Sequence, residues 1–74
     1  MLDRILRAKT FYVRSTGRNA NFLYVGDDEY NQLKETNAMT FRLTNTLANS
    51  AGDYFVHGLK VMHVLTNSHF KITS

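Results

Sequence analysis

Cysteine is absent from this chain of 74 residues. Its absence rules out disulfides, cysteine-ligated zinc, iron–sulfur clusters and a thiol nucleophile. A chain of this length buries only roughly 60 % of the surface that its unfolded form exposes, so we expect a single small domain, residues 1–74, of marginal stability. Because it has no covalent staple, we expect such a domain to gain stability by oligomerisation or by docking on a larger partner.

Long apolar runs are also missing. No stretch of about 18 apolar residues occurs, so we expect no membrane span. The first seven residues alternate charged and apolar side chains and lack the hydrophobic region that a secretory signal needs. These two absences indicate an intracellular origin.

Charge is distributed unevenly around a net value of +3. Residues 1–18 hold five basic side chains against one acidic, residues 19–58 hold two against five, and the remainder adds two lysines. A basic N-terminal segment suits a phosphate backbone or an acidic protein surface equally.

The first half of the chain carries both helix and strand signals. Leu2, Ile5 and Leu6 have helical spacing and predict a short helix or an arm over 1–9. Aromatic and β-branched residues predict strands at 10–14 and 22–25. Gly26 then ends the second strand, and the acidic residues 27–29 meet the free N–H groups of a helix predicted over 28–35.

The second half reads as strands. Alternation predicts one strand near 39–44, followed by a mobile loop at 45–53, and Asn67-Ser68 predicts a hairpin turn between strands 59–66 and 69–73. We therefore predict an α+β fold, with a small antiparallel sheet of about four to five strands, one central short helix and a C-terminal β-hairpin. One hairpin face would be core and the other a second, half-apolar face. The core face would hold Leu59, Val61, His63, Leu65, Phe70 and Ile72, and the second face Lys60, Met62, Val64, Thr66, His69 and Lys71.

Neither a metal site nor a catalytic site is expected. The predicted hairpin places His63 and His69 on opposite faces, and His57 is about 20 Å from His63 along an extended strand, so His63 is interpreted as a core or interface residue. The acidic run 27–29 is explained as a solvated first turn of a helix. Gly17 and Gly26 are too far apart to form a phosphate cradle. We therefore expect no enzyme activity and no cofactor.

Three segments together suggest a setting. The stretches 24–34, 54–64 and 69–72 resemble small uncharacterised proteins of tailed bacteriophages, whose layout is a strand, a glycine turn into an acidic-started helix and a glycine-led hairpin. The resemblance covers roughly residues 22–72. It implies a phage setting, in the virion or the host cytoplasm, and carries over no functional residue.

We expect a non-enzymatic, phage-type structural or accessory protein, such as a capsid decoration or minor virion component. It would act through protein contacts, as a homo-oligomer or as a subunit of a larger viral assembly. The alternatives are a small basic nucleic-acid-binding regulator, with Tyr12 as a stacking side chain, and an inhibitor of a host protein. The predicted partner-binding residues come from the basic segment and the second hairpin face: Arg4, Arg7, Lys9, Tyr12, Arg14, Arg18, Lys60, Met62, Val64 and Lys71.

Overall fold

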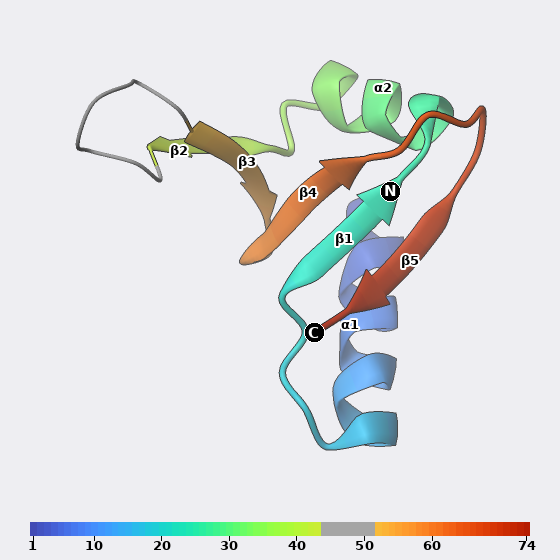
Figure 1. Cartoon of the computed structure of the whole chain (residues 1–74), viewed down its shortest axis with the longest axis vertical. Helices are drawn as coiled ribbons and strands as arrows, with labels where there is room; N and C mark the ends of the chain where they lie inside the picture. Colours follow the sequence, from blue (N-terminus) through green and yellow to red (C-terminus); the bar gives the residue numbers. More distant parts are fainter. Residues whose placement is uncertain (44–51) are drawn as a thin grey trace.

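The structure, a computed structural model, describes residues 1–43 and 52–74. These ranges contain two helices and five strands that form one sheet in the order β2-β3-β4-β1-β5 (Figure 1). The α+β prediction is confirmed. In chain order the elements are α1 (Leu2–Thr16), β1 (Phe22–Val25), α2 (Asp27–Glu35), β2 (Thr40–Leu43), β3 (Gly52–Val56), β4 (Leu59–His63) and β5 (Phe70–Thr73).

The sheet is mixed, because β1 runs parallel to β4 while the other neighbouring strands are antiparallel. β1 lies between β4 and β5, so the predicted pairing of these two strands as a hairpin is wrong. Residues 64–69 do not form a tight turn but pass beyond the end of β1. A tight turn through His57 and Gly58, both of which have positive φ, joins β3 to β4 as a hairpin.

The connection 64–69 is held by the start of α2. Three successive N–H groups, those of residues 26–28, donate hydrogen bonds to the carbonyl oxygens of His69, Thr66 and Asn67, in that order. These are donors that a helix start leaves without partners inside the helix. A Cβ on Gly26 would lie 2.8 Å from the His69 nitrogen and 2.9 Å from the Thr66 oxygen. The close approach of the two backbones therefore requires glycine at position 26.

The Glu29 side chain also binds the connection 64–69. It is 5 % exposed, and its carboxylate accepts hydrogen bonds from the Ser68 hydroxyl at 2.7 Å and from the His69 N–H at 2.9 Å. These two bonds, the Ser68 one first, lower the pKa of Glu29 to about 2. The prediction of a solvated acidic turn is thus wrong at Glu29, although Asp28 is exposed.

The N-terminal helix α1 is longer than predicted. It continues through residues 10–14, where a strand was expected, and ends at Gly17 in the left-handed conformation (φ 69°), whose N–H donates to the Val13 carbonyl. Ile5 is fully buried and Tyr12, two turns later, packs against the same core. Continuing the helix is favoured because it places both side chains on one face. Residues 1–9 are therefore part of a packed helix and not an arm.

Both helices pack on one face of the sheet, and Figure 1 shows α1 behind β1 and β5. Leu23 on β1 is aligned with Val61 and Ile72 on its neighbours, so all three share the covered face. The predicted division of the C-terminal strands into a core face and a second face thus holds for residues within β4 and β5. The insertion of β1 between these two strands does not change which side chains share a face. The predicted division is wrong for Leu65, which lies beyond β4 and is 99 % exposed. The buried apolar core consists of Ile5, Ala20, Leu23, Val25, Leu33, Val56 and Leu59.

The predicted mobile loop 45–53 falls almost entirely outside the described residues. Gly52 and Asp53 are described, and they belong to β3, paired with Leu43 and Arg42 of β2. The expectation is wrong for these two residues.

The close contact at Gly26 predicts the effect of adding one methyl group. We expect Gly26→Ala to lower the free energy of unfolding by about 1–3 kcal/mol, because the atoms that the new Cβ meets are backbone atoms that cannot rotate away. Urea denaturation followed by circular dichroism measures the change. Ser15→Ala, at the exposed end of α1, is the control and should alter stability by less than about 0.5 kcal/mol. Equal stability of Gly26→Ala and the wild type would contradict the close crossing.

Glu29 predicts a defined acid sensitivity. Its pKa is lowered on folding from 4.5 to about 2, so its contribution to stability is full above 4.5 and is lost as the pH falls toward 2. We expect Glu29→Gln to be less stable at neutral pH and to lose stability less steeply across this window. Urea midpoints measured at several pH values test this. Glu35→Gln, an exposed carboxylate at the other end of α2, is the control, and an equal change of slope in both variants would contradict the role of Glu29.

Candidate binding surfaces

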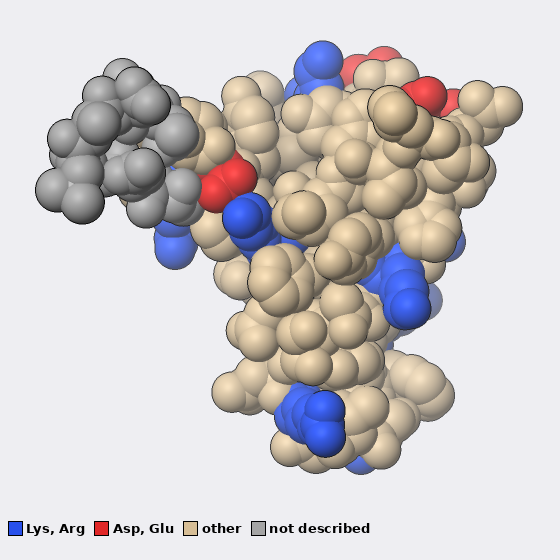
Figure 2. All heavy atoms as spheres, viewed as in Figure 1, with Lys and Arg blue, Asp and Glu red and all other residues tan. Residues whose placement is uncertain are grey.

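One face of the sheet is covered by neither α1 nor α2. Side chains alternate along each strand, so those next to the core residues point to this opposite side, which we call the open face. Figure 2 shows it toward the viewer, mainly uncharged over β4, β1 and β5, with basic side chains around it. By register it consists of Phe22, Tyr24, Thr40, Arg42, Asp53, Phe55, Lys60, Met62, Lys71 and Thr73.

Aromatic and basic side chains lie next to each other at the centre of the open face. Tyr24 on β1 is flanked by Met62 on β4 and Lys71 on β5. In the adjoining row, Phe22 is flanked by Lys60 and Thr73. The two aromatic residues of β1 and Met62 are half-buried and Lys71 is exposed. β1 thus presents two aromatic rings with one lysine beside each.

The β3 side of the open face repeats this combination. Phe55 is paired across the strands with Lys60, and the Arg42 guanidinium lies 5.3 Å from the centre of the Phe55 ring. Lys60 also forms an ion pair with Asp53 at 3.4 Å, in which both side chains remain about one third exposed. A pair of this kind contributes little to stability, so Lys60 can exchange Asp53 for another anion at low cost.

The outward side of α1 is a second candidate surface. Phe11 is 73 % exposed, Leu6 49 % and Val13 37 %. Two shallow hollows of about 340 Å³ and 310 Å³ adjoin one another along the helix and share Leu6, Thr10 and Arg14 as walls. We call this surface the outer face of α1, and it consists of Leu6, Arg7, Thr10, Phe11, Val13 and Arg14.

Three predicted partner-binding residues of α1 make contacts within the molecule. The Lys9 ammonium donates a hydrogen bond to the His57 carbonyl at 2.7 Å, and the Arg4 guanidinium stacks 4.1 Å from the centre of the Phe70 ring. The Tyr12 hydroxyl forms a hydrogen bond with the Ser74 hydroxyl at 3.0 Å and accepts one from the Ser74 N–H at 3.0 Å. These interactions with Ser74, the hydroxyl one first, hold the pKa of Tyr12 below its ordinary value. Each of these side chains fixes α1 to the sheet or to the turn before β4.

The other predicted residues fall into separate groups. Arg7 and Arg14 are on the outer face of α1, and Arg18 is exposed just beyond Gly17. Lys60, Met62 and Lys71 are on the open face, across the sheet from α1. Val64 is half-buried just after β4, and its N–H donates to the Val25 carbonyl. The predicted site is therefore two surfaces on opposite sides of the molecule, with Val64 and Arg18 outside both.

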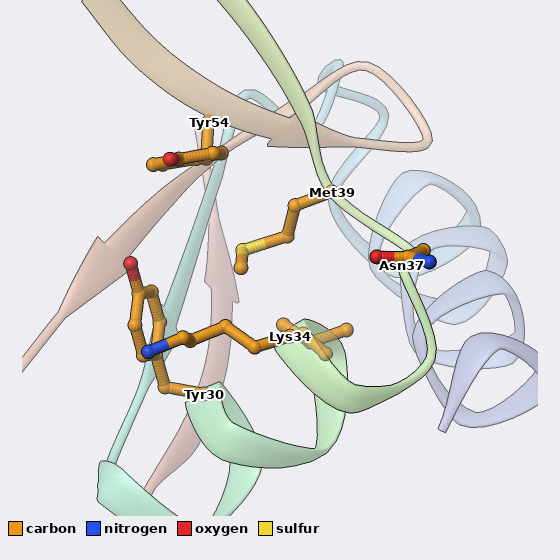
Figure 3. Close-up of a pocket in the computed structure, with 6 residues that line it drawn as sticks. Tyr30, Lys34, Asn37, Met39 and Tyr54 are labelled. Carbon is orange, nitrogen blue, oxygen red and sulfur yellow. The ribbon is translucent and has the colours of Figure 1, made fainter.

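A cleft of about 320 Å³ lies between α2, the segment that leads into β2, and Tyr54 of β3. Figure 3 shows Tyr30, Met39 and Tyr54 directed toward a common space, with Lys34 alongside Tyr30. Leu33 and Asn37 complete its walls.

Tyr30 of the cleft also stacks on His63, with ring centres 4.3 Å apart and an angle of 8° between the planes. The His63 Nε2 lies 2.6 Å from a carboxylate oxygen of Asp27. His63 was interpreted as a core or interface residue; its side chain is 37 % exposed, so the core alternative is wrong and the interface alternative stays a prediction. His63 lies at the margin of the covered face, tied to the first turn of α2.

The three histidines lie apart from one another in the fold. His57 is in the β3–β4 turn, His63 ends β4, and His69 precedes β5. Over the described ranges, no group of three or more histidine and acidic side chains is placed to hold a metal ion. Neither α1 nor α2 is long and apolar enough to cross a membrane.

Sequence reasoning assigned no binding role to Phe11, Phe22 or Tyr24. Phe11 was missed because the strand interpretation of 10–14 placed it on the side away from the arginines. The helix reverses this, since Arg7 and Arg14 stand four residues before and three residues after Phe11. The signal for the other two was present: in the strand 22–25, aromatic residues occupy the positions that alternate with core residues Leu23 and Val25.

No family model, curated protein or solved structure matches this chain. The class that the coordinates define is a small α+β domain whose mixed sheet is covered by helices on one side. The surfaces that this domain offers for binding include the open face and the outer face of α1.

Proposed function

We propose that this chain is a non-enzymatic structural or accessory subunit that acts through protein–protein contacts. One observation carries the proposal: the outer face of α1 exposes Phe11 and Leu6 beside Arg7 and Arg14. Aromatic residues and arginine are the residue types that protein interfaces favour, and a few such anchors supply most of the binding energy. In the isolated chain these apolar side chains face water.

The complementary surface is present on the same chain. Four of the six acidic residues lie on α2, where Asp28 and Glu35 are exposed. A basic, apolar helix on one copy and an acidic helix on the next form a head-to-tail contact, which builds rings or open arrays. Over residues 1–43 and 52–74 the buried core holds seven apolar residues. Burying further apolar surface between copies would add to the stability of so small a fold.

The resemblance to small proteins of tailed bacteriophages suggests the setting for this assembly. A decoration or minor virion component forms repeated contacts and needs no catalytic centre. We therefore propose that this chain belongs to a virion or to a virus-encoded accessory assembly.

Self-association through α1 can be measured directly. We expect the sedimentation coefficient to rise with protein concentration, and Phe11→Ser to weaken association by about 2 kcal/mol, or roughly thirtyfold, because it removes the apolar anchor. Arg14→Glu should also weaken it by repelling the acidic helix. The matched control is Phe41→Ser, which removes another exposed aromatic, 51 % exposed on β2, and should leave association unchanged.

Two results would contradict the proposal. Undiminished association of Phe11→Ser would exclude the outer face of α1 as the interface. A chain that remains monomeric at every concentration and does not co-sediment with purified tailed-phage capsids would overturn the assembly role as a whole.

A further inference from the structure

We propose that the open face of the sheet binds single-stranded nucleic acid, with bases stacked on Phe22 and Tyr24 and phosphates held by Lys60 and Lys71. This surface lies across the sheet from α1, so the proposal is independent of the assembly role. The proposed site is also distinct from the nucleic-acid site expected in the basic N-terminal segment. The stacking residue of that segment, Tyr12, is hydrogen-bonded to Ser74 instead.

The register of the strands carries the first part of the inference. Each aromatic residue on β1 has a lysine in register on an adjacent strand, Lys60 beside Phe22 and Lys71 beside Tyr24. Neighbouring strands lie about 4.8 Å apart and residues of one face repeat about every 6.6 Å along a strand. A stacked base and the phosphate attached to it therefore find a ring and an ammonium group at neighbouring positions.

The distribution of charge carries the second part. Five of the six acidic residues lie on α1 and α2, whose packing side is the covered face. Asp53 is the single acidic residue on the open face, and it is paired with Lys60. Against it stand Arg42, Lys60 and Lys71. The helices carry five basic residues as well, so the contrast lies on the open face itself, where three basic side chains outnumber one acidic side chain. This net positive charge suits a polyanion.

The partial burial of the aromatic side chains favours nucleic-acid bases over a protein as the ligand of the open face. Phe22, Tyr24 and Phe55 are half-buried, whereas the aromatic residue on the outer face of α1 is 73 % exposed. Rings that lie low among their neighbours form a platform without protruding anchors. Single strands bind such platforms through base stacking on aromatic side chains, as the sheets of some RNA-binding domains do. In a duplex the bases are already stacked on one another and do not reach the platform.

Fluorescence anisotropy with labelled oligothymidylate and oligouridylate at low salt tests the inference. We expect both to bind, with affinity that falls as salt rises, and the same-length duplex and a poly-glutamate peptide to bind at least tenfold more weakly. Tighter binding of oligothymidylate or of oligouridylate shows whether the open face selects DNA or RNA. Binding of the duplex or of poly-glutamate as tight as that of the single strands would overturn the proposal.

Paired variants distinguish a loss of binding caused by the missing aromatic ring from one caused by unfolding. Tyr24→Leu should weaken binding by about fivefold to a hundredfold, whereas Tyr24→Phe, which keeps the ring, should bind like the wild type. Tyr54→Leu removes a tyrosine from the covered side of the sheet and is the control for loss of an aromatic residue. Circular dichroism establishes that each variant is folded before it is assayed, and a folded Tyr24→Leu with wild-type affinity would overturn the proposal.

The charge contribution is read from the salt dependence. Lys71→Gln should reduce the slope of log affinity against log salt by about 0.7, the value for one phosphate contact on a single strand. Phe11→Ser, on α1, should leave oligonucleotide binding unchanged, so failure of one proposal is distinguishable from failure of the other. No binding at low salt, together with loss of self-association in Tyr24→Leu, would reassign the open face to a protein contact and overturn the inference.

Discussion

The passage of residues 64–69 across the end of β1 is the constraint on which the rest of this structure depends. The N–H groups that begin α2 bind the carbonyls of this segment, and the buried Glu29 carboxylate binds Ser68 and His69. This crossing holds β5 on the far side of β1 from β4, because the connection bridges the inserted strand. The mixed strand order follows from it, and so does the alignment of lysines beside Phe22 and Tyr24 on the open face.

The two faces of the sheet divide the chain's chemistry. On the covered face, both helices bury a small apolar core and carry nearly all of the acidic residues. On the open face, aromatic and basic side chains alternate without a covering helix among the described residues. The outer face of α1 adds a third surface, basic and apolar, on the opposite side of the molecule. The two proposed binding surfaces therefore lie on opposite sides of the molecule, so that occupation of one would leave the other accessible.

Local sequence signals predicted α2, strand 22–25 and the alternation of the C-terminal strands, because each depends on neighbours in the sequence. The pairing of β4 with β1 could not be predicted, since Asn67-Ser68 is compatible with a tight turn and the competing bonds come from residues 26–28, about 40 positions away. Residues 10–14 were misassigned because the strand propensity of Phe11, Tyr12 and Val13 is outweighed by burial of Tyr12 against the core. Of the open face, Lys60 and Lys71 were predicted, whereas Arg42, Phe22 and Tyr24 needed the register to acquire a role.

The position of β1 between β4 and β5 also determines when the sheet can form during synthesis. β1 leaves the ribosome early, but both of its partners are made more than 30 residues later. Until β4 has emerged, β1 has no neighbouring strand on either side, and Leu23 and Val25 lack Val56 and Leu59 of the core. Contacts so distant in sequence slow folding. The sheet therefore cannot be complete until β5 has been made, and β1 must wait for partners that are distant in the sequence.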